Sequence, residues 1–378
     1  MQITKTTAYP LRYPEPNDRM VMRHVTLVKM ETDSGLVGWG ECISQWPEAA
    51  LAVKVLIEQG IGRVLLGRDP LEDHALVLAM KESCWWYGDT GMANFAISAL
   101  DIALWDLKGK ALGVPIHKLL GGKLHDRLRA CASTHPSKAR LEDLAAELAG
   151  HAANGYTAVK VGFGKMGEAN LGVDPQRDIA YVRAVREAIG PDVDFMVDLG
   201  KKTRWDYASG VRMSREFEKY NLRWIEDPFP PTNIEAYQHL RQSIQTQVAA
   251  GEREWTPAAY QRLINAGVAD IYLADPGRVE GITGVKKVID MTAAAHLFFN
   301  PHTWSSAINT AAALHLTATA PNYIVFELKP VPSPLQYELV TQPIEQKGGW
   351  VTVLDGPGLG IEINEDAVHK YLFDSVVG

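Results

Sequence analysis

The first third of the chain combines strand-like and helix-like patterns of hydrophobic residues. Alternating apolar and polar positions predict strands at residues 3–10 and 25–31, and the glycine-rich stretch 35–40 is typical of a hairpin. Apolar residues recurring with helical periodicity predict helices over residues 48–58, 70–81 and 93–112. Gly113 and Pro115 mark the end of the last helix. The pattern indicates an α+β domain over residues 1–126.

From about residue 127 the pattern changes to short apolar runs that alternate with helical segments. Eight runs are expected to be strands, at residues 129–133, 157–161, 193–197, 222–225, 247–250, 270–274, 297–299 and 323–326. Seven helical segments fit between them, so the simplest closed arrangement is a (β/α)7β barrel, a modified TIM barrel, over residues 127–335. Residues 336–378 contain no further unit and are expected to return to the N-terminal domain. The predicted fold class is α/β, with an α+β cap on the barrel.

Composition narrows the possible classes of protein. The 378 residues are 46% hydrophobic and 22% charged, which is typical of a globular chain with a sizeable core. The net charge of −7 offers no general attraction to nucleic acid or to anionic lipid. Cys42, Cys84 and Cys131 lie far apart and form no CxxC pair, so neither a disulfide framework nor a zinc knuckle is expected. Without a signal pattern or an uninterrupted apolar helix, we expect a soluble cytoplasmic protein.

Ionisable residues lie at or just after seven of the eight predicted strands: Lys160, Asp198, Glu226, Glu252, Asp275, His302 and Glu327. From Asp198 onward they are separated by 28, 26, 23, 27 and 25 residues, which is one βα unit each. This spacing places them on the C-terminal rim of the barrel, where active sites of this fold lie.

Three consecutive strand ends carry carboxylates, namely Asp198, Glu226 and Glu252. Carboxylates crowded at one rim repel each other unless a cation lies among them. Hard oxygen donors without clustered His or Cys favour Mg²⁺ over Zn²⁺. The sequence therefore predicts a magnesium site at these three residues.

The remaining rim residues suggest acid–base chemistry. Asp275 and His302 follow adjacent strands, and a carboxylate that orients a histidine makes a general acid or base. Lys160 is either a second base, if a nearby cation lowers its pKa, or a structural ammonium beside the carboxylates. Glu327 either donates a hydrogen bond when protonated or caps a loop.

Several longer motifs agree with this interpretation. They are residues 93–110 with 119–122, Trp224–Pro228, Gly251–Glu252, Asp275 with Gly281–Thr283, Asn300–His302 and Gly356–Glu362. Together they span nearly the whole chain, which resembles the mandelate racemase-like branch of the enolase superfamily. The resemblance implies Mg²⁺ bound by Asp198, Glu226 and Glu252, and a His302–Asp275 dyad. It also implies removal of the proton α to a substrate carboxylate, giving a metal-stabilised enediolate.

Two local sequences refine the expected reaction. Racemizing members of this branch carry Lys-x-Lys on the second strand, whereas this chain has Ala158-Val-Lys160-Val-Gly162, so one lysine is missing. Counted from Gly155, Lys160 is the first lysine of the pair, and counted back from Gly164 it is the second. The stretch Glu252–Thr256 is similar to acid-sugar dehydratases of the rhamnonate type. We therefore expect a hydro-lyase that dehydrates a sugar acid, with His302 as acid and either His302 or Lys160 as base. An epimerase, a racemase, a lactone cycloisomerase and a non-catalytic binding barrel are the alternatives.

Other residues are candidates for substrate recognition. Arg19, Arg23 and His24 suit a polyhydroxylated anion and Trp85 could wall the site, although surface charge and aromatic packing explain these residues equally well. His135 and Lys201 follow the first and third strands. Gly162–Gly167 matches G-x-G-x-x-G, but no helix opens directly after it, so a dinucleotide site is not expected. The expected partners are a small sugar acid and further copies of this chain in a homo-oligomer, with no nucleic acid and no membrane.

Overall fold

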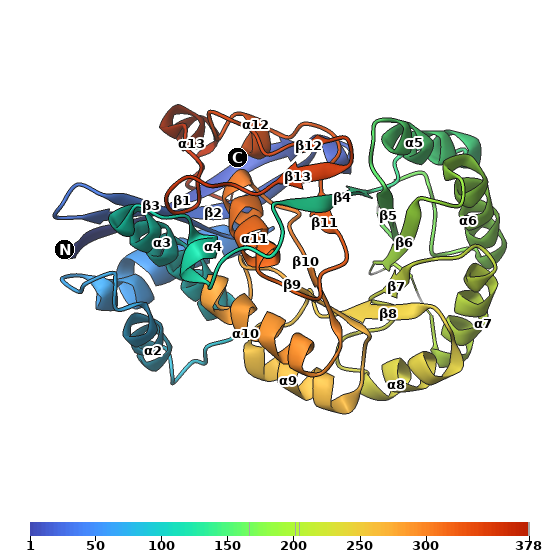
Figure 1. The fold of residues 1–378 in the computed structure, drawn as a ribbon, viewed down its shortest axis with the longest axis horizontal. Coiled ribbons are helices and arrows are strands. Elements are labelled where there is room, and N and C mark those ends of the chain that lie inside the picture. Colours follow the sequence, from blue (N-terminus) through green and yellow to red (C-terminus); the bar gives the residue numbers. More distant parts are fainter. Residues whose placement is uncertain (166, 201, 204, 377–378) are drawn as a thin grey trace.

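The computed structural model describes residues 1–165, 167–200, 202–203 and 205–376, and shows a capped barrel (Figure 1). The cap begins with a meander of three antiparallel strands in the order β1-β2-β3, namely β1 (Ile3–Glu15), β2 (Val21–Thr32) and β3 (Val37–Cys42). The first two strands are longer than their apolar alternation predicts, because they stay paired up to Glu15 and Val21. Their extended tip reaches the barrel.

Helices α1 (Pro47–Val55), α2 (Asp73–Ser83) and α3 (Met92–Leu112) complete the cap. Helix α3 lies directly against β3, because that strand has glycine at the contact points. A Cβ atom on Gly38 would lie 2.3 Å from the carbonyl oxygen of Ala103, and one on Gly40 would lie 1.9 Å from that of Ala99. Side chains there would push the helix away from the strand.

The barrel consists of eight parallel strands, each but the last followed by a helix on the outside, within the described part of the chain (Figure 1). The strands are β4 (Arg127–Thr134), β5 (Ala158–Phe163), β6 (Asp194–Leu199), β7 (Trp224–Glu226), β8 (Gln247–Ala250), β9 (Ile271–Ala274), β10 (Phe298–Pro301) and β11 (Phe326–Leu328). The helices are α5 (Leu141–Ala153), α6 (Pro175–Ile189), α7 (Tyr207–Glu218), α8 (Ile234–Ser243), α9 (Pro257–Ala266), α10 (Gly281–Ala294) and α11 (Ala307–Ala318).

The barrel closes where β11 pairs with β4, and a bridge between Phe299 and Tyr323 joins β10 to the segment before β11. Its interior below the rim is filled by a cluster that includes Cys131, Met196 and Trp224. The predicted capped (β/α)7β fold is confirmed. None of the described helices is both long and apolar enough to cross a membrane.

The C-terminal segment contacts both parts of the molecule. Strands β12 (Gln346–Lys347) and β13 (Trp350–Thr352) form an antiparallel pair that adds to β4 of the barrel. Helix α13 (Glu365–Tyr371) then packs on β1 of the cap. The short helix α12 (Pro334–Tyr337) precedes both. The domain boundaries at 126/127 and 335/336 stay predictions.

A buried histidine fixes this segment to the barrel. His315 on α11 donates from Nε2 to the carbonyl oxygen of Leu359 over 3.0 Å. It stacks on His117 of α4 (Ile116–Leu119), with ring centroids 5.5 Å apart. Burial lowers the pKa of His315 to about 4. In the unfolded chain His315 therefore takes up a proton when the pH falls below its ordinary pKa near 6.5. In the folded chain it does so only below about pH 4.

This difference predicts a loss of stability in mild acid. Between pH 7 and pH 5 the wild type is expected to lose about 2 kcal/mol more free energy of unfolding than His315→Gln, which keeps a donor but does not titrate. Urea unfolding followed by circular dichroism measures the two losses. Equal losses in both proteins would contradict a buried neutral imidazole.

Candidate active site

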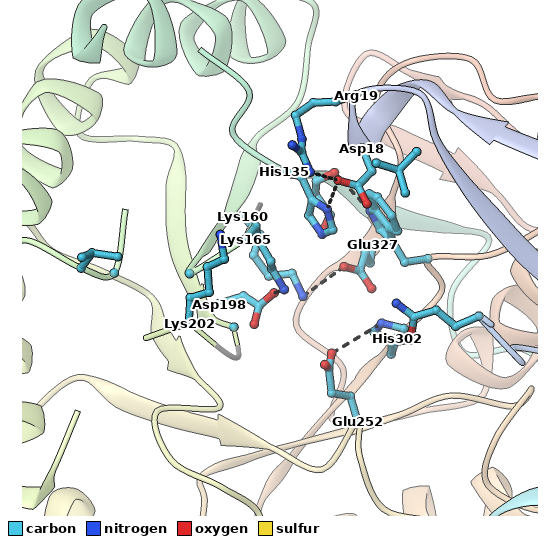
Figure 2. Close-up of a pocket in the computed structure, with 18 of the residues that line it drawn as sticks. Asp18, Arg19, His135, Lys160, Lys165, Asp198, Lys202, Glu252, His302 and Glu327 are labelled. Atoms are coloured by element: carbon cyan, nitrogen blue, oxygen red, sulfur yellow. Dashed lines mark hydrogen bonds and ion pairs between the residues drawn. The ribbon is translucent and has the colours of Figure 1, made fainter. Parts of the chain in front are cut away.

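A cavity of about 1290 Å³ opens between the cap and the C-terminal ends of the barrel strands (Figure 2). Most of the residues predicted for the rim line it directly, namely Lys160, Asp198, Glu252, His302 and Glu327. The other two, Glu226 and Asp275, are fully buried just behind this lining and are bonded to Lys160 and His302. The structure therefore brings together all seven strand-end residues that the sequence selects.

Asp275 and His302 form a hydrogen-bonded pair. His302 Nδ1 lies 2.5 Å from Asp275 Oδ2, and Asp275 Oδ1 accepts from the backbone nitrogen of Gly277 (2.7 Å) and from Asn309 Nδ2 (3.1 Å). Both oxygens of Asp275 therefore make hydrogen bonds, and this fixes the orientation of the His302 ring. The Nε2 atom of His302 is left on the cavity side, 3.5 Å from Glu252 Oε2. Burial lowers the pKa of His302, but Glu252, Asp275 and Glu327 outweigh it and raise the value to about 10.

Lys160 links two carboxylates. Its Nζ lies 2.9 and 3.0 Å from the two oxygens of Glu226 and 3.0 Å from Glu327 Oε1. Trp224 Nε1 also donates to Glu226 Oε2 over 3.0 Å. Against the effect of burial, these acids hold the pKa of Lys160 well above its ordinary value. The contacts fit the structural-ammonium alternative for Lys160 and do not show the neutral amine that a base needs.

Glu327 accepts hydrogen bonds and does not donate them. Its Oε2 accepts from the backbone nitrogen of Thr303 over 3.0 Å. Burial would raise the pKa of Glu327, but Lys160 and His302 lower it to about 2. The lowered pKa and the contact with Thr303 favour an ionised acceptor over a protonated donor, and the role of Glu327 stays a prediction.

Asp198 has a partner that the sequence analysis missed. Lys165, three residues beyond the glycine that ends the Lys160-Val-Gly162 stretch, places its Nζ 2.8 Å from Asp198 Oδ2. Burial would raise the pKa of Asp198, but Lys165 and Lys160 lower it to about 2. Lys165 lies in the glycine-rich loop after β5, and its only signal in the sequence is a cationic residue close to a strand end.

The three carboxylates predicted for metal binding are turned toward side chains of the protein. In the part of the chain that the structure describes, no three His, Cys, Asp or Glu side chains converge closely enough to hold a metal ion. The donor chemistry nevertheless fits a hard cation. The described rim carries five carboxylates against two ammonium groups: Asp198, Glu226, Glu252, Asp275 and Glu327 against Lys160 and Lys165.

The cap contributes a second cluster, centred on Asp18 at the tip of the β1–β2 hairpin. Arg23 Nη2 lies 2.6 Å from Asp18 Oδ2, and Arg19 Nη2 and His135 Nδ1 both lie 3.3 Å from Asp18 Oδ1. His135 stacks on Trp304 with ring centroids 4.3 Å apart. Burial would raise the pKa of Asp18, but His135 and Arg23 hold it well below its usual range.

Arg19, Arg23 and His135 therefore line the cavity, together with Asp18 and Trp304, which the sequence analysis missed. The hairpin tip is fixed to the barrel by Asn17, which exchanges two hydrogen bonds with the backbone of Val331. Sequence reasoning could not find Asp18, because nothing in the chain links this hairpin to the first barrel strand.

Two of the predicted substrate contacts lie elsewhere. His24 is next to Arg23 on β2, so alternation turns its side chain away from the cavity, where it contacts the carbonyl oxygen of Gln45 (3.3 Å) and the ring of Phe373. Trp85 is 72% exposed on the outer surface of the cap and lines no part of the cavity. Lys201 lies outside the described residues. The glycine-rich motif that starts at Gly162 does not open into a helix, as expected from the sequence. The next helix, α6, begins at Pro175 with Asp174 as its N-cap.

Comparison with known proteins agrees with this architecture. Residues 143–367 match the enolase C-terminal domain-like family, and residues 15–121 match the N-terminal domain of the mandelate racemase / muconate lactonizing enzyme family. A capped barrel with an acidic rim of this kind defines an enzyme of the enolase superfamily, whose members generally use Mg²⁺. The chain belongs to the mandelate racemase / muconate lactonizing enzyme branch of that superfamily.

Relatives of two activities are similar over nearly their whole length. The chain is 31% identical to a D-galactarolactone cycloisomerase of Agrobacterium fabrum, over 98% of this chain and 99% of that protein. It is 30% identical to a D-galactonate dehydratase of Pectobacterium atrosepticum, over 97% of this chain and 94% of that protein. The crystal structure of the 3,6-anhydro-D-galactonate cycloisomerase from Zobellia galactanivorans superposes with a TM-score of 0.87, at 29% identity, over 99% of this chain and 100% of that one.

Proposed function

We propose that this enzyme dehydrates a sugar acid to a 2-keto-3-deoxy acid in a Mg²⁺-dependent reaction. The observation that carries the proposal is the His302–Asp275 pair, which leaves one imidazole nitrogen on the cavity side of a strongly acidic rim. A histidine held in this way suits proton transfer to a departing oxygen. Arg19 and Arg23 of the cap hairpin, beside His135 at the end of β4, suit the carboxylate and hydroxyl groups of such a substrate.

Asp198, Glu226 and Glu252 are the proposed ligands of the metal. All three offer hard oxygen donors, and the excess of carboxylates at the rim favours a divalent cation. Bound Mg²⁺ would neutralise the substrate carboxylate and so make the adjacent C–H bond more acidic. Lys160 keeps Glu226 and Glu327 in place as an ammonium group between them.

In the proposed reaction the substrate loses its α-proton and its β-hydroxyl, which together make one molecule of water. The α-proton leaves to a base at the rim, and the electrons of the C–H bond form an enediolate. The enediolate collapses and breaks the bond to the β-hydroxyl, which takes a proton from His302 Nε2 and leaves as water. The resulting enol becomes the 2-keto-3-deoxy acid by tautomerisation.

A lactone cycloisomerase is a second candidate, supported by the cycloisomerases among the similar proteins. Both reactions begin with loss of the proton α to a carboxylate and continue with departure of a β-oxygen. They differ in the leaving group, which is a hydroxyl in the dehydratase and a ring oxygen in the cycloisomerase. The same His302 would protonate either oxygen, so the substrate decides between the two.

Product analysis distinguishes these candidates. Incubated with a set of aldonic acids, aldaric acids and their lactones in the presence of Mg²⁺, the enzyme is expected to form a 2-keto acid that has lost one water, and to form none after treatment with EDTA. Semicarbazide detection and mass spectrometry measure the product. An isomer of unchanged mass would replace the dehydratase by the cycloisomerase or epimerase, and metal-independent turnover would contradict the magnesium site.

His302→Asn tests the proton transfer. General acid–base catalysis contributes about 10² to 10⁴-fold, so kcat is expected to fall by that order while KM changes little, and Asp275→Asn should cost less because the imidazole remains. The matched control is His296→Asn, on an exposed residue with φ of 56°, where asparagine is well tolerated. Dehydration by His302→Asn at close to the wild-type rate would remove the histidine from the mechanism.

The same variant identifies the group that removes the α-proton. Exchange of the substrate α-proton in deuterated water, followed by proton NMR, is measured alongside dehydration. If exchange persists in His302→Asn, the base is a lysine, Lys160 or Lys165, on the other side of the cavity. If exchange disappears, the base is His302.

A further inference from the structure

Gly162 leaves an empty side-chain position at the rim. It lies two residues after Lys160 on β5, and it is in register with Asp198 on the neighbouring parallel strand β6. Alternate residues of a strand share a face, and residues in register on parallel neighbours point the same way. A side chain at residue 162 would therefore point into the barrel mouth beside Asp198.

The side chain of Lys165 fills this position from the loop. A Cβ atom on Gly162 would lie 2.4 Å from Cε of Lys165, 2.9 Å from its Cγ and 3.2 Å from its Cδ. At these distances a side chain at residue 162 would have to displace the flexible Lys165 side chain from its present path. The Lys165 chain runs along the vacant position and ends in the ion pair with Asp198.

The turn that brings Lys165 back is built into the backbone. Gly164 has a φ of +64°, and a Cβ atom there would lie 2.5 Å from Thr203 Oγ1. Its backbone nitrogen donates to the carbonyl oxygen of Leu171 over 2.7 Å, and the nitrogen of Gly200 donates to that of Phe163 over 2.7 Å. Glycine at residue 164 permits this reversal, so the position of Lys165 is a product of the fold.

Lys165 and His302 approach the cavity from nearly opposite sides. In the closed barrel β5 and β10 are separated on the shorter way round by β4 and β11. Figure 2 shows Lys165 with Asp198 on one side of the cavity and His302 with Glu252 on the other. Both side chains line the cavity.

We propose that Lys165, folded back over the position that Gly162 leaves open, binds the anionic end of the substrate with its ammonium group, across the cavity from His302. The proposal rests on the proposed function for the nature of the substrate. If Asp198 held a metal ion, Lys165 would lose this partner, and its ammonium group would be free to donate to the substrate carboxylate. A charged hydrogen bond of this kind stabilises an anion in a cavity from which water is excluded.

Oxalate is a suitable probe, because it is a small planar dianion that the enzyme cannot dehydrate. With Mg²⁺ present, Lys165→Met is expected to bind oxalate at least about tenfold more weakly than the wild type, measured by isothermal titration calorimetry. Mg²⁺ binding without oxalate should be unchanged or tighter, because Asp198 loses a competing cation. A purely structural counter-ion would instead leave the oxalate affinity of the Mg²⁺-loaded protein unchanged. Lys219→Met, which removes a surface ion pair with Glu216, is the matched control.

Variants at residue 162 test the shared space itself. Gly162→Ala should displace Lys165 and so weaken oxalate binding. Added to Lys165→Ala, in which that space is empty, the same substitution should not weaken oxalate binding further. The double variant Gly162→Lys/Lys165→Ala moves the lysine onto the strand and should recover most of the affinity. Thermal unfolding confirms that each variant folds.

The outcomes separate this inference from the proposed function. Equal oxalate affinity in Lys165→Met and wild type, or additive effects of Gly162→Ala and Lys165→Ala, would overturn the role of Lys165 while leaving the dehydratase intact. No oxalate binding by the Mg²⁺-loaded wild type would count against the metal site and Lys165 together. Normal oxalate results without turnover of any sugar acid would contradict only the proposed reaction.

Discussion

The repulsion among carboxylates at the mouth of the barrel is the constraint on which the candidate site depends. Two such charges 4 Å apart repel by about 4 kcal/mol at the effective dielectric of a protein surface. The described rim offsets this repulsion with Lys160 between Glu226 and Glu327, Lys165 on Asp198, and His302 against Asp275 and Glu252. Five acids against two lysines and His302, whose pKa is raised to about 10, still leave an excess of negative charge. A divalent cation at the proposed ligands Asp198, Glu226 and Glu252 would relieve this excess and would free Lys165 from its pair with Asp198.

The cap is fixed to the barrel by buried polar contacts, so the two halves of the site keep their relative position. Glu41 at the end of β3 accepts from the side chains of Ser305 and Ser306 and from the backbone nitrogen of Asn309, 3.1 Å away, at the start of α11. Glu15 at the end of β1 pairs with Lys329 just after β11 over 2.7 Å, and both side chains are completely buried. Removing one partner of such a pair is costly, because it leaves a buried charge. The cap hairpin is thus held over the acidic rim of the barrel.

Residues at strand ends could be predicted from the sequence, whereas residues on folded-back loops could not. The regular spacing of Asp198, Glu226, Glu252, Asp275, His302 and Glu327 follows from one βα unit per strand, and the barrel geometry turns that spacing into proximity. Lys165 reaches the rim only because the chain reverses at Gly164, and Asp18 only because the β1–β2 hairpin extends over the barrel. The candidate His24 does not line the cavity, because the register that points Arg23 inward turns its neighbour away. Tertiary contacts determine where these side chains lie, so no local sequence pattern predicts their positions.

Titration of Mg²⁺ into the metal-free protein, without substrate, tests the central claim most directly. Calorimetry is expected to show one divalent site per chain, lost in Glu226→Gln, where an uncharged amide replaces a proposed ligand without a change of size. Glu216→Gln, on the surface pair with Lys219, should bind as the wild type does. An unfolding temperature close to that of the wild type would show that Glu226→Gln remains folded. Unchanged Mg²⁺ affinity in that folded variant would contradict the account of the acidic rim as a metal site.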